Sequence, residues 1–137
     1  MNCFAIAPDE VRATWPDYAH LFEKFERDDG ETSAREVFEC ASTGLMQIWG
    51  VQDGKDVLGV CATEVQKTAR GRICLVRIAS GRRVPTQIQA QLLAEIGTWA
   101  RGLNCISVRL IGRKGWLRRF KQFRVTQVVA EWNLRTN

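Results

Sequence analysis

The chain has 137 residues, of which 45% are hydrophobic and 26% are charged, and its formal net charge is +5. These values predict one globular domain with a single core and argue against a disordered chain. No apolar run approaches the ~20 residues of a membrane-spanning helix, and the first residues, MNCFAIAPDE, lack the features of a signal peptide. We therefore expect a cytoplasmic protein.

The chain contains five cysteines, Cys3, Cys40, Cys61, Cys74 and Cys105. An odd number without a CxxC pair argues against a disulfide framework and against a zinc knuckle. A single histidine also argues against a metal site built from two or three imidazoles. Cys61, Cys74 and Cys105 lie in apolar runs, where a thiol is more often a small buried hydrophobe than a nucleophile. We expect reduced thiols and no metal centre.

The first part of the chain predicts a short strand followed by two helices. An apolar run at residues 3–7 ends at a proline, and apolar residues at helical spacing then predict a helix over residues 9–22. After a turn, a second helix is predicted through residue 40. Thr32 or Ser33 is expected to be its N-cap, with Glu36 near the position that a capping box requires.

The middle of the chain changes from helical to strand-like periodicity. Residues 45–51 and 57–65 predict two strands of a hairpin, because the turn between them contains Asp53-Gly54. Residues 73–79 predict a third strand. The hairpin implies antiparallel pairing of the first two strands.

The last part of the chain predicts the longest helix, at residues 85–101, then a strand at 105–111, a short helix at 115–123 and a final strand at 125–134. The long helix between two strands suggests a parallel crossover, whereas the earlier hairpin is antiparallel. The chain is therefore expected to have an α/β (α+β) fold, with a mixed sheet and helices on its faces.

This order of elements resembles the GNAT superfamily of acetyl-CoA-dependent N-acetyltransferases, most clearly over residues 73–134. The phrase ARGLNCISVRLIGRKGW is also similar to small GNAT-like proteins encoded by phages and prophages. The shared turn would be formed by Gly112, Arg113, Gly115 and Trp116. The resemblance implies a single GNAT-like domain over residues 1–137, with a mixed, mostly antiparallel sheet flanked by helices, and acetyl-CoA as the cofactor.

The GNAT resemblance also implies a glycine-rich loop that holds the pyrophosphate of coenzyme A before the long helix. The two glycine positions fall on Gln87 and Gln89, and the leading Arg or Gln falls on Val84, so the motif is absent as usually written. A shortened or altered loop could lie just upstream. The candidate cofactor-binding residues are Ile78, Ser80, Gly81, Arg82 and Arg83. The alternative is a solvated basic turn.

Catalytic residues are harder to identify. The tyrosine that the resemblance implies as general acid falls on Phe120, which has no hydroxyl, and Tyr18 is expected to pack in the first helix. Glu64 is the candidate general base, although strand alternation could equally turn it to water. His20 is expected to lie at the surface or to pack on the first helix.

The stretch GRKGWLRRFKQFR combines aromatic and basic residues. In a helix, Trp116, Phe120 and Phe123 form one apolar stripe, which favours packing on the sheet over stacking on nucleic-acid bases. The basic side chains would line one end of the sheet and could bind coenzyme A, an acidic protein or the backbone of a nucleic acid. The basic residues that would contact an acidic protein or a nucleic-acid backbone are Arg113, Lys114, Arg118, Arg119 and Lys121.

Charge is unevenly distributed along the chain. Residues 1–40 carry ten acidic against four basic side chains, a formal charge of −6, which leaves +11 for the remaining residues. Such polarity can steer an anionic partner without identifying it. Three functions remain open: an N-acyltransferase with a divergent or lost cofactor loop, a catalytically inactive phage or prophage protein that binds other proteins, and a non-specific nucleic-acid binder.

Overall fold

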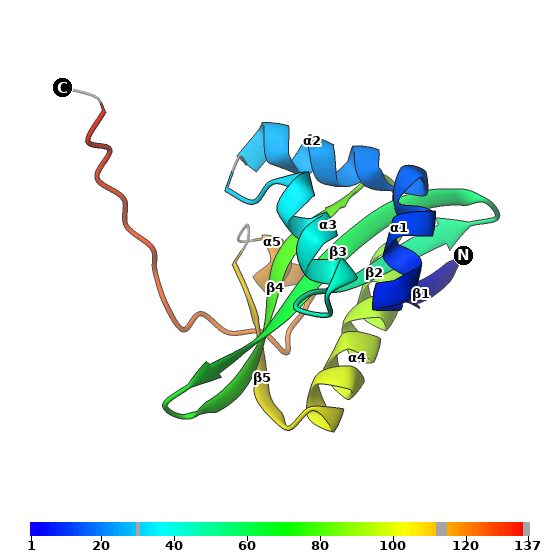
Figure 1. Ribbon diagram of the computed structural model, residues 1–137. Coiled ribbons are helices and arrows are strands. Elements are labelled where there is room, and N and C mark those ends of the chain that lie inside the picture. Colours follow the sequence, from blue (N-terminus) through cyan, green and yellow to red (C-terminus); the bar gives the residue numbers. More distant parts are fainter. Residues whose placement is uncertain (30, 112–114, 136–137) are drawn as a thin grey trace.

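A five-stranded sheet forms the centre of the protein in the computed structural model, which describes residues 1–29, 31–111 and 115–135 (Figure 1). The strands follow one another in chain order across the sheet. They are β1 (Asn2–Ile6), β2 (Gln47–Asp53), β3 (Asp56–Thr68), β4 (Gly71–Gly81) and β5 (Cys105–Leu110). Neighbouring strands are antiparallel except β4 and β5, which are parallel. The expected mixed, mostly antiparallel sheet is confirmed.

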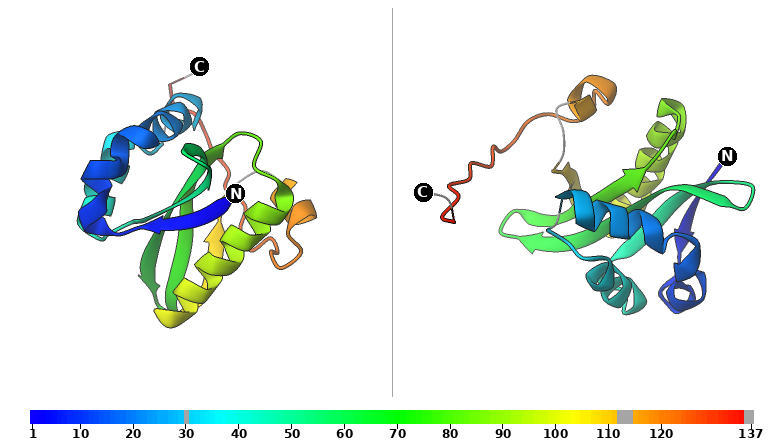
Figure 2. Two further views of the ribbon diagram at one scale, coloured as in Figure 1. Left: turned by 90° about the vertical axis from the view of Figure 1, so that its right-hand side faces the viewer. Right: turned by 90° about the horizontal axis from the view of Figure 1, so that it is seen from above.

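Helices cover both faces of the sheet (Figures 1 and 2). The helical segments on one face are η1 (Pro8–Glu10), α1 (Val11–Thr14), η2 (Trp15–Asp17), α2 (Ala19–Asp29) and α3 (Ala34–Ser42). The long helix α4 (Thr86–Gly102) packs on the other face, and the short helix α5 (Gly115–Arg119) follows β5. None of the described helices is both long and apolar enough to cross a bilayer.

Alternation along the central strands divides the core into two layers. Ile48, Val60 and Ala62 belong to the cluster beneath the N-terminal helices, whereas the adjacent Trp49 and Cys61 belong to the cluster beneath α4. Successive side chains of a strand point to opposite faces. The central strands are therefore apolar at consecutive positions, because both of their faces are covered.

The structure corrects the single helix expected over residues 9–22, which is divided into short segments. Pro16 lies in the middle of that range, and a proline removes one backbone donor and disfavours a continuous helix. The start of α3 agrees with the expectation, because the Glu36 amide donates a hydrogen bond to Ser33 Oγ over 3.0 Å. Ser33 rather than Thr32 is therefore the N-cap.

The structure also overturns the expected last strand. Residues 125–134 form no strand, and the chain extends away from the body after α5 (Figure 1). Helix α5 ends at Arg119, earlier than the expected residue 123. The sequence of residues 125–134 has strand-like composition, but composition alone does not make a strand, and these residues pair with none of the described strands.

Candidate functional site

The strands β4 and β5 pair over only part of their lengths. Pairing runs from Arg72 to Val76 on β4, opposite Cys105 to Leu110 on β5. Beyond Val76, β4 continues through Arg77–Gly81 and pairs with β3 alone among the described residues. We call Arg77–Gly81 the β4 opening, because β5 no longer pairs with β4 along these residues.

A β-bulge marks the start of the β4 opening. Ala62 of β3 is opposite Ile78, and the next residue, Thr63, is opposite Val76, so Arg77 is the extra residue on β4. A bulge bends its strand and redirects a side chain. The Ile78 side chain lies in the core, so only its backbone could contact a ligand at the opening.

Ser80 and Gly81 are the last residues of β4 rather than part of a loop. The Ser80 hydroxyl donates a hydrogen bond to the Leu21 carbonyl over 2.9 Å and so ties β4 to α2. A Cβ at Gly81 would lie 2.7 Å from both Gly59 Cα and the Leu58 carbonyl oxygen. Close packing against β3 therefore explains this glycine.

Arg82 and Arg83 connect the β4 opening to the first turn of α4. The Arg82 amide donates to the Leu58 carbonyl over 3.1 Å, and both side chains are exposed. Arg83 adopts a left-handed backbone conformation with φ of 57°. Pro85, the N-cap of α4, provides no side-chain cap. The first amides of a helix lack partners within the helix. Two guanidiniums, Arg82 and Arg83, therefore lie within a few residues of a helix N-terminus whose amides can donate hydrogen bonds to an anion.

Gln89 performs a structural role where a glycine was expected. Its side-chain amide donates to the Val84 carbonyl over 2.9 Å, and its Oε1 accepts from Arg119 Nη1 over 3.2 Å. The side chain thus links the loop before α4 to α5. The sequence carried no signal for this contact, because Arg119 is 30 residues away.

Glu64 lies in a hydrogen-bonded network beside the β4 opening. Its Oε2 accepts from Arg77 Nη1 over 3.1 Å, and its Oε1 accepts from Gln66 Nε2 over 2.8 Å. Arg77 also donates to Thr32 Oγ1 over 3.2 Å, and the Thr32 side chain is buried. The carboxylate therefore has a fixed orientation, and no local signal in the sequence points to Arg77 as its partner.

Tyr18 and His20, the only tyrosine and the only histidine of the sequence, have contrasting environments. Tyr18 is 1% exposed, and its hydroxyl pairs with Thr14 Oγ1 over 2.9 Å. Burial raises the pKa of the Tyr18 phenol. His20 is exposed on α2. Phe120, at the position where the resemblance implies a tyrosine, is 3% exposed, in agreement with the expected packing role.

The buried cysteines do not have the properties of nucleophiles. Burial raises the pKa of the Cys61 thiol to about 12, and the neighbouring Cys74 adds to the effect. Burial and the neighbouring Cys105 raise the pKa of the Cys74 thiol to about 11. Because the thiolate is the reactive form, both residues are inert at neutral pH. Their interpretation as small buried hydrophobes is confirmed by this environment.

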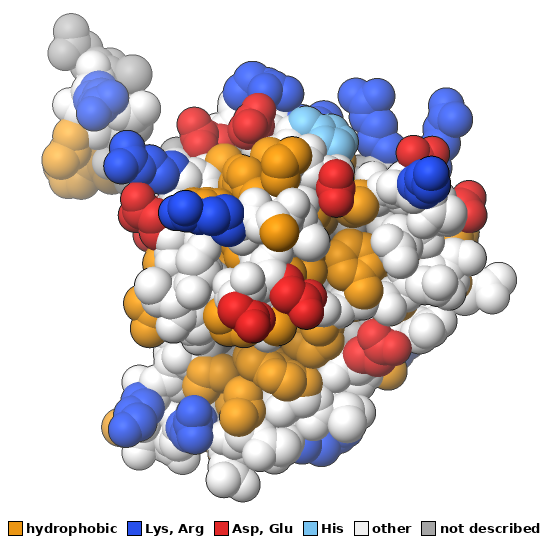
Figure 3. All heavy atoms as spheres, turned by 45° about the vertical axis from the view of Figure 1, so that its right-hand side comes forward, with side chains coloured by type: hydrophobic (Ala, Val, Ile, Leu, Met, Phe, Trp, Pro, Cys, Tyr) orange, Lys and Arg blue, Asp and Glu red, His pale blue; other side chains and the backbone are white. Residues whose placement is uncertain are grey.

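The basic residues near α5 are only partly described. Arg118, Arg119 and Lys121 are exposed, whereas Arg113 and Lys114 lie outside the described residues. Figure 3 shows another face, where Asp and Glu side chains are spread among apolar ones and Lys and Arg side chains lie mainly near the borders. Binding of an acidic protein or a nucleic acid at the residues near α5 therefore stays a prediction.

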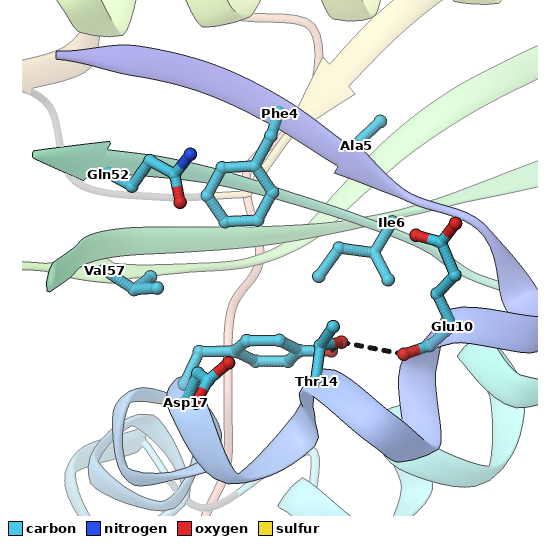
Figure 4. Close-up of a pocket in the computed structure, with 9 residues that line it drawn as sticks. Phe4, Ala5, Ile6, Glu10, Thr14, Asp17, Gln52 and Val57 are labelled. Carbon is cyan, nitrogen blue, oxygen red and sulfur yellow. Dashed lines mark hydrogen bonds between the residues drawn. The ribbon is translucent and has the colours of Figure 1, made fainter. Parts of the chain in front are cut away.

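A separate pocket of about 260 Å³ lies on the β1 side of the sheet (Figure 4). Its lining residues are Phe4, Ala5, Ile6, Glu10, Thr14, Asp17, Tyr18, Gln52 and Val57. They come from β1, the adjoining ends of β2 and β3, and the first helical segments. β1 and β4 are separated by two strands, so this pocket does not belong to the β4 opening.

No protein-family model matches the chain, and no curated protein matches it either. Its fold is similar to that of a probable acetyltransferase, with a TM-score of 0.72 and 14% sequence identity over 100% of this chain and 99% of that one. A predicted acetyltransferase from Clostridium acetobutylicum, solved with acetyl-CoA, gives a TM-score of 0.69 and 16% identity over 98% and 96% of the two chains.

A ribosomal-protein-alanine N-acetyltransferase from Brucella melitensis biovar Abortus 2308 is similar over 99% of both chains, with a TM-score of 0.68 and 10% identity. Identities this low establish the fold alone. Each of these structures is matched over nearly its whole length, so the likeness includes the sheet and the helices on both faces. The chain has the fold of the GNAT acetyltransferases.

Proposed function

We propose that the protein is an acetyl-CoA-dependent N-acyltransferase that binds its cofactor at the β4 opening. The observation that carries this proposal is the end of β4–β5 pairing at Val76, directly before the bulge and the loop to α4. Further support comes from the acetyl-CoA present in one acetyltransferase structure of the same fold. Fold likeness alone does not establish a reaction, so the site residues decide the proposal.

The residues present fit the cofactor in two ways. The backbone of Arg77–Gly81 has groups on its β5 side that could hydrogen-bond to the amides of a pantetheine chain. Arg82, Arg83 and the first turn of α4 could hold the pyrophosphate, because guanidiniums and helix N-termini both bind phosphate. Gln87 and Gln89 replace the expected glycines, so the two guanidiniums would carry a larger part of phosphate binding.

Acetyl-CoA would supply an acetyl group activated as a thioester. Within this proposal Glu64 is the general base that takes a proton from the acceptor amine. Arg77 and Gln66 hold its carboxylate beside the β4 opening. Phe120 has no hydroxyl, so the chain does not use a tyrosine acid at that position. A missing general acid typically slows a reaction by about 10²–10⁴-fold without preventing it.

Calorimetric titration with acetyl-CoA, and separately with CoA, tests the binding step. We expect micromolar binding to the wild-type protein and a loss of about 10-fold to 100-fold in Arg82→Ala/Arg83→Ala, which removes charge-assisted phosphate contacts. Arg12→Ala/Arg70→Ala removes the same charge from exposed positions outside the site and should bind as the wild type does. Absence of binding at millimolar ligand, or equal losses in both double variants, would contradict the proposal.

A panel of primary amines tests the chemical step. Glu64→Gln should lower the acetylation rate by about 10²–10⁴-fold while acetyl-CoA binding is kept, because a general base contributes to that extent. Gln66→Leu leaves the carboxylate in place and should lower the rate much less. If the wild type binds acetyl-CoA but acetylates no amine, the proposed activity is wrong and the site has a binding role only.

A further inference from the structure

Residues 125–134, VTQVVAEWNL, have the pattern of a strand with one apolar face. We call them the C-terminal segment. If the segment is extended, Thr126, Val128, Ala130, Trp132 and Leu134 lie on one side. Among these, Val128 is 87% exposed and Trp132 is 85% exposed. Large apolar side chains that are exposed together in a short segment indicate a contact surface.

The C-terminal segment lies apart from the body of its own chain. Figure 1 and the right-hand view of Figure 2 show it running outward beyond α5. It pairs with no strand of the described chain. Val125, Val129 and Leu134 are also largely exposed, so neither side of the segment is covered. Burial of apolar area is worth roughly 25 cal/mol per Å², which favours a partner for this segment.

The sheet has a complementary edge. β5 is the last strand of the sheet, and among the described residues it pairs only with β4. Ile106 on this strand is 61% exposed. An unprotected edge strand presents a row of backbone donors and acceptors to any further strand. The described residues therefore include both a strand-like segment that pairs with no strand and a sheet edge that pairs on one side only.

We propose that the C-terminal segment of one copy pairs with β5 of a second copy, and that the exchange is reciprocal. Each sheet then gains one strand, and the two identical contacts satisfy each other, so the exchange closes as a two-fold dimer instead of continuing from copy to copy. Because the segment extends away from its own β5, a second copy is favoured over its own chain as the partner. This inference does not depend on the acyltransferase proposal.

Charge supports the same pairing. Arg109 is the only charged residue of β5, and Glu131 is the only charged residue of the C-terminal segment. Opposite charges on neighbouring strands stabilise a pair, whereas like charges destabilise it. Two copies brought together in this way would place one carboxylate-bearing strand against one guanidinium-bearing strand at each contact. The remaining side chains of the segment are uncharged and can be buried without an ionic partner.

Sedimentation velocity of the full chain over a range of concentrations tests the proposal. We expect a monomer–dimer equilibrium for the wild type. Val128→Lys, on the apolar face of the segment, should weaken the dimer at least about 10-fold, because it would bury an unpaired charge. Val129→Lys changes the adjacent residue of the same type on the opposite face and should weaken the dimer much less.

Hydrogen exchange measured at high and low protein concentration separates the two possible partners. Exchange between copies predicts that residues 105–110 and 125–134 are protected in the dimer and lose protection together on dilution. If the protein is a monomer and the amides of residues 105–110 and 125–134 are protected at both concentrations, the segment pairs within its own chain and the proposal is wrong. A monomer without protection, or a dimer that survives Val128→Lys, would also overturn it.

Discussion

Two segments of this chain have similar strand-like sequences and opposite fates. Residues 57–65, VLGVCATEV, lie within β3, where β2 and β4 flank the strand and helices cover both faces. The C-terminal segment, VTQVVAEWNL, is also rich in β-branched and apolar residues, yet it forms no strand in the described chain. β-propensity measures how well a residue fits a pleated, half-buried surface, so a segment without that surface does not become a strand.

The comparison separates local sequence preference from the supply of hydrogen-bond partners. In β3, backbone groups pair with neighbours on both sides, and Val60 is 3% exposed. In the C-terminal segment, Val128 is 87% exposed. The same side chain thus contributes to stability in one region and contributes little in the other. Substitutions of the same kind at buried and at exposed positions measure that difference in stability.

The largest expected effect comes from aromatic truncation in the core beside β3 and in the C-terminal segment. Phe22→Ala should lower the free energy of unfolding by about 3–5 kcal/mol, because Phe22 is buried and stacks on Trp15 at a centroid distance of 5.5 Å. Trp132→Ala should change it by less than about 0.5 kcal/mol at protein concentrations that favour the monomer. Urea unfolding measures both values. A large loss for Trp132→Ala in the monomer would show that the segment packs on its own chain.

Glycine substitutions compare the packed end of β4 with an open helix surface. Gly81→Ala should destabilise the protein by about 1–3 kcal/mol, because its Cβ would meet the backbone of Leu58 and Gly59. Gly97→Ala in α4 places the new Cβ more than 4 Å from any atom apart from its chain neighbours and the backbone of its own helix, so it should raise stability by up to about 1 kcal/mol. Thermal unfolding of both variants gives the comparison. Equal effects of the same sign would contradict the packing of Gly81 against β3.

Ion pairs give a smaller contrast between a half-buried and an exposed environment. The Arg77–Glu64 pair, with side-chain exposures of 28% and 25%, should show a coupling energy of about 1.5–3 kcal/mol in a double-mutant cycle. The Arg35–Glu39 pair on α3, with exposures of 87% and 61%, should give only about 0.3–0.5 kcal/mol. Similar coupling in the two cycles would mean that the Glu64 network is not fixed in solution.

The smallest effect at neutral pH concerns the thiols. Alkylation of the native protein, followed by mass spectrometry, should modify the partly exposed Cys3, Cys40 and Cys105 before the buried Cys61 and Cys74. Rapid modification of Cys61 in the native state would show that the central strands open readily.

The same thiols predict how stability depends on pH. The pKa of Cys61 is raised from 9.0 to about 12, and the pKa of Cys74 from 9.0 to about 11. Between pH 9 and these values the unfolded chain loses protons that the folded chain keeps. The contribution of both thiols to stability is therefore complete below pH 9 and is lost as the pH rises toward 12. Cys61→Ala/Cys74→Ala should show a weaker loss of stability in this range.

Local signals in the sequence predicted most of the fold. The Ser33 cap depends on a hydrogen bond within one turn, and the hairpin between β2 and β3 depends on a short glycine turn with positive φ at Gly54. The parallel relation of β4 and β5 follows from the long helix that joins them. Each of these features is decided by residues close together in the chain, so a single sequence was sufficient.

The candidate site was predicted less completely, because its features depend on registers between strands. The sequence identified Glu64 as a candidate, but its pairing with Arg77 requires the bulge that places Arg77 opposite no residue of β3. Gly81 was a candidate for cofactor binding, and its close approach to β3 is a contact between strands that local sequence does not specify. Gln89 and Arg119 meet only because α4 and α5 lie side by side in the folded chain.

By itself, the sequence determined the class of fold, the positions of the caps and turns, and the side chains that are buried on the central strands. These properties follow from periodicity and backbone preference, which act over a few residues. Only the tertiary structure decided where β4 separates from β5, which atoms surround Glu64, and that the C-terminal segment stays outside the sheet. The physical reason is that hydrogen bonds between strands and contacts between layers require two distant segments to meet, and one segment's sequence does not specify its partner.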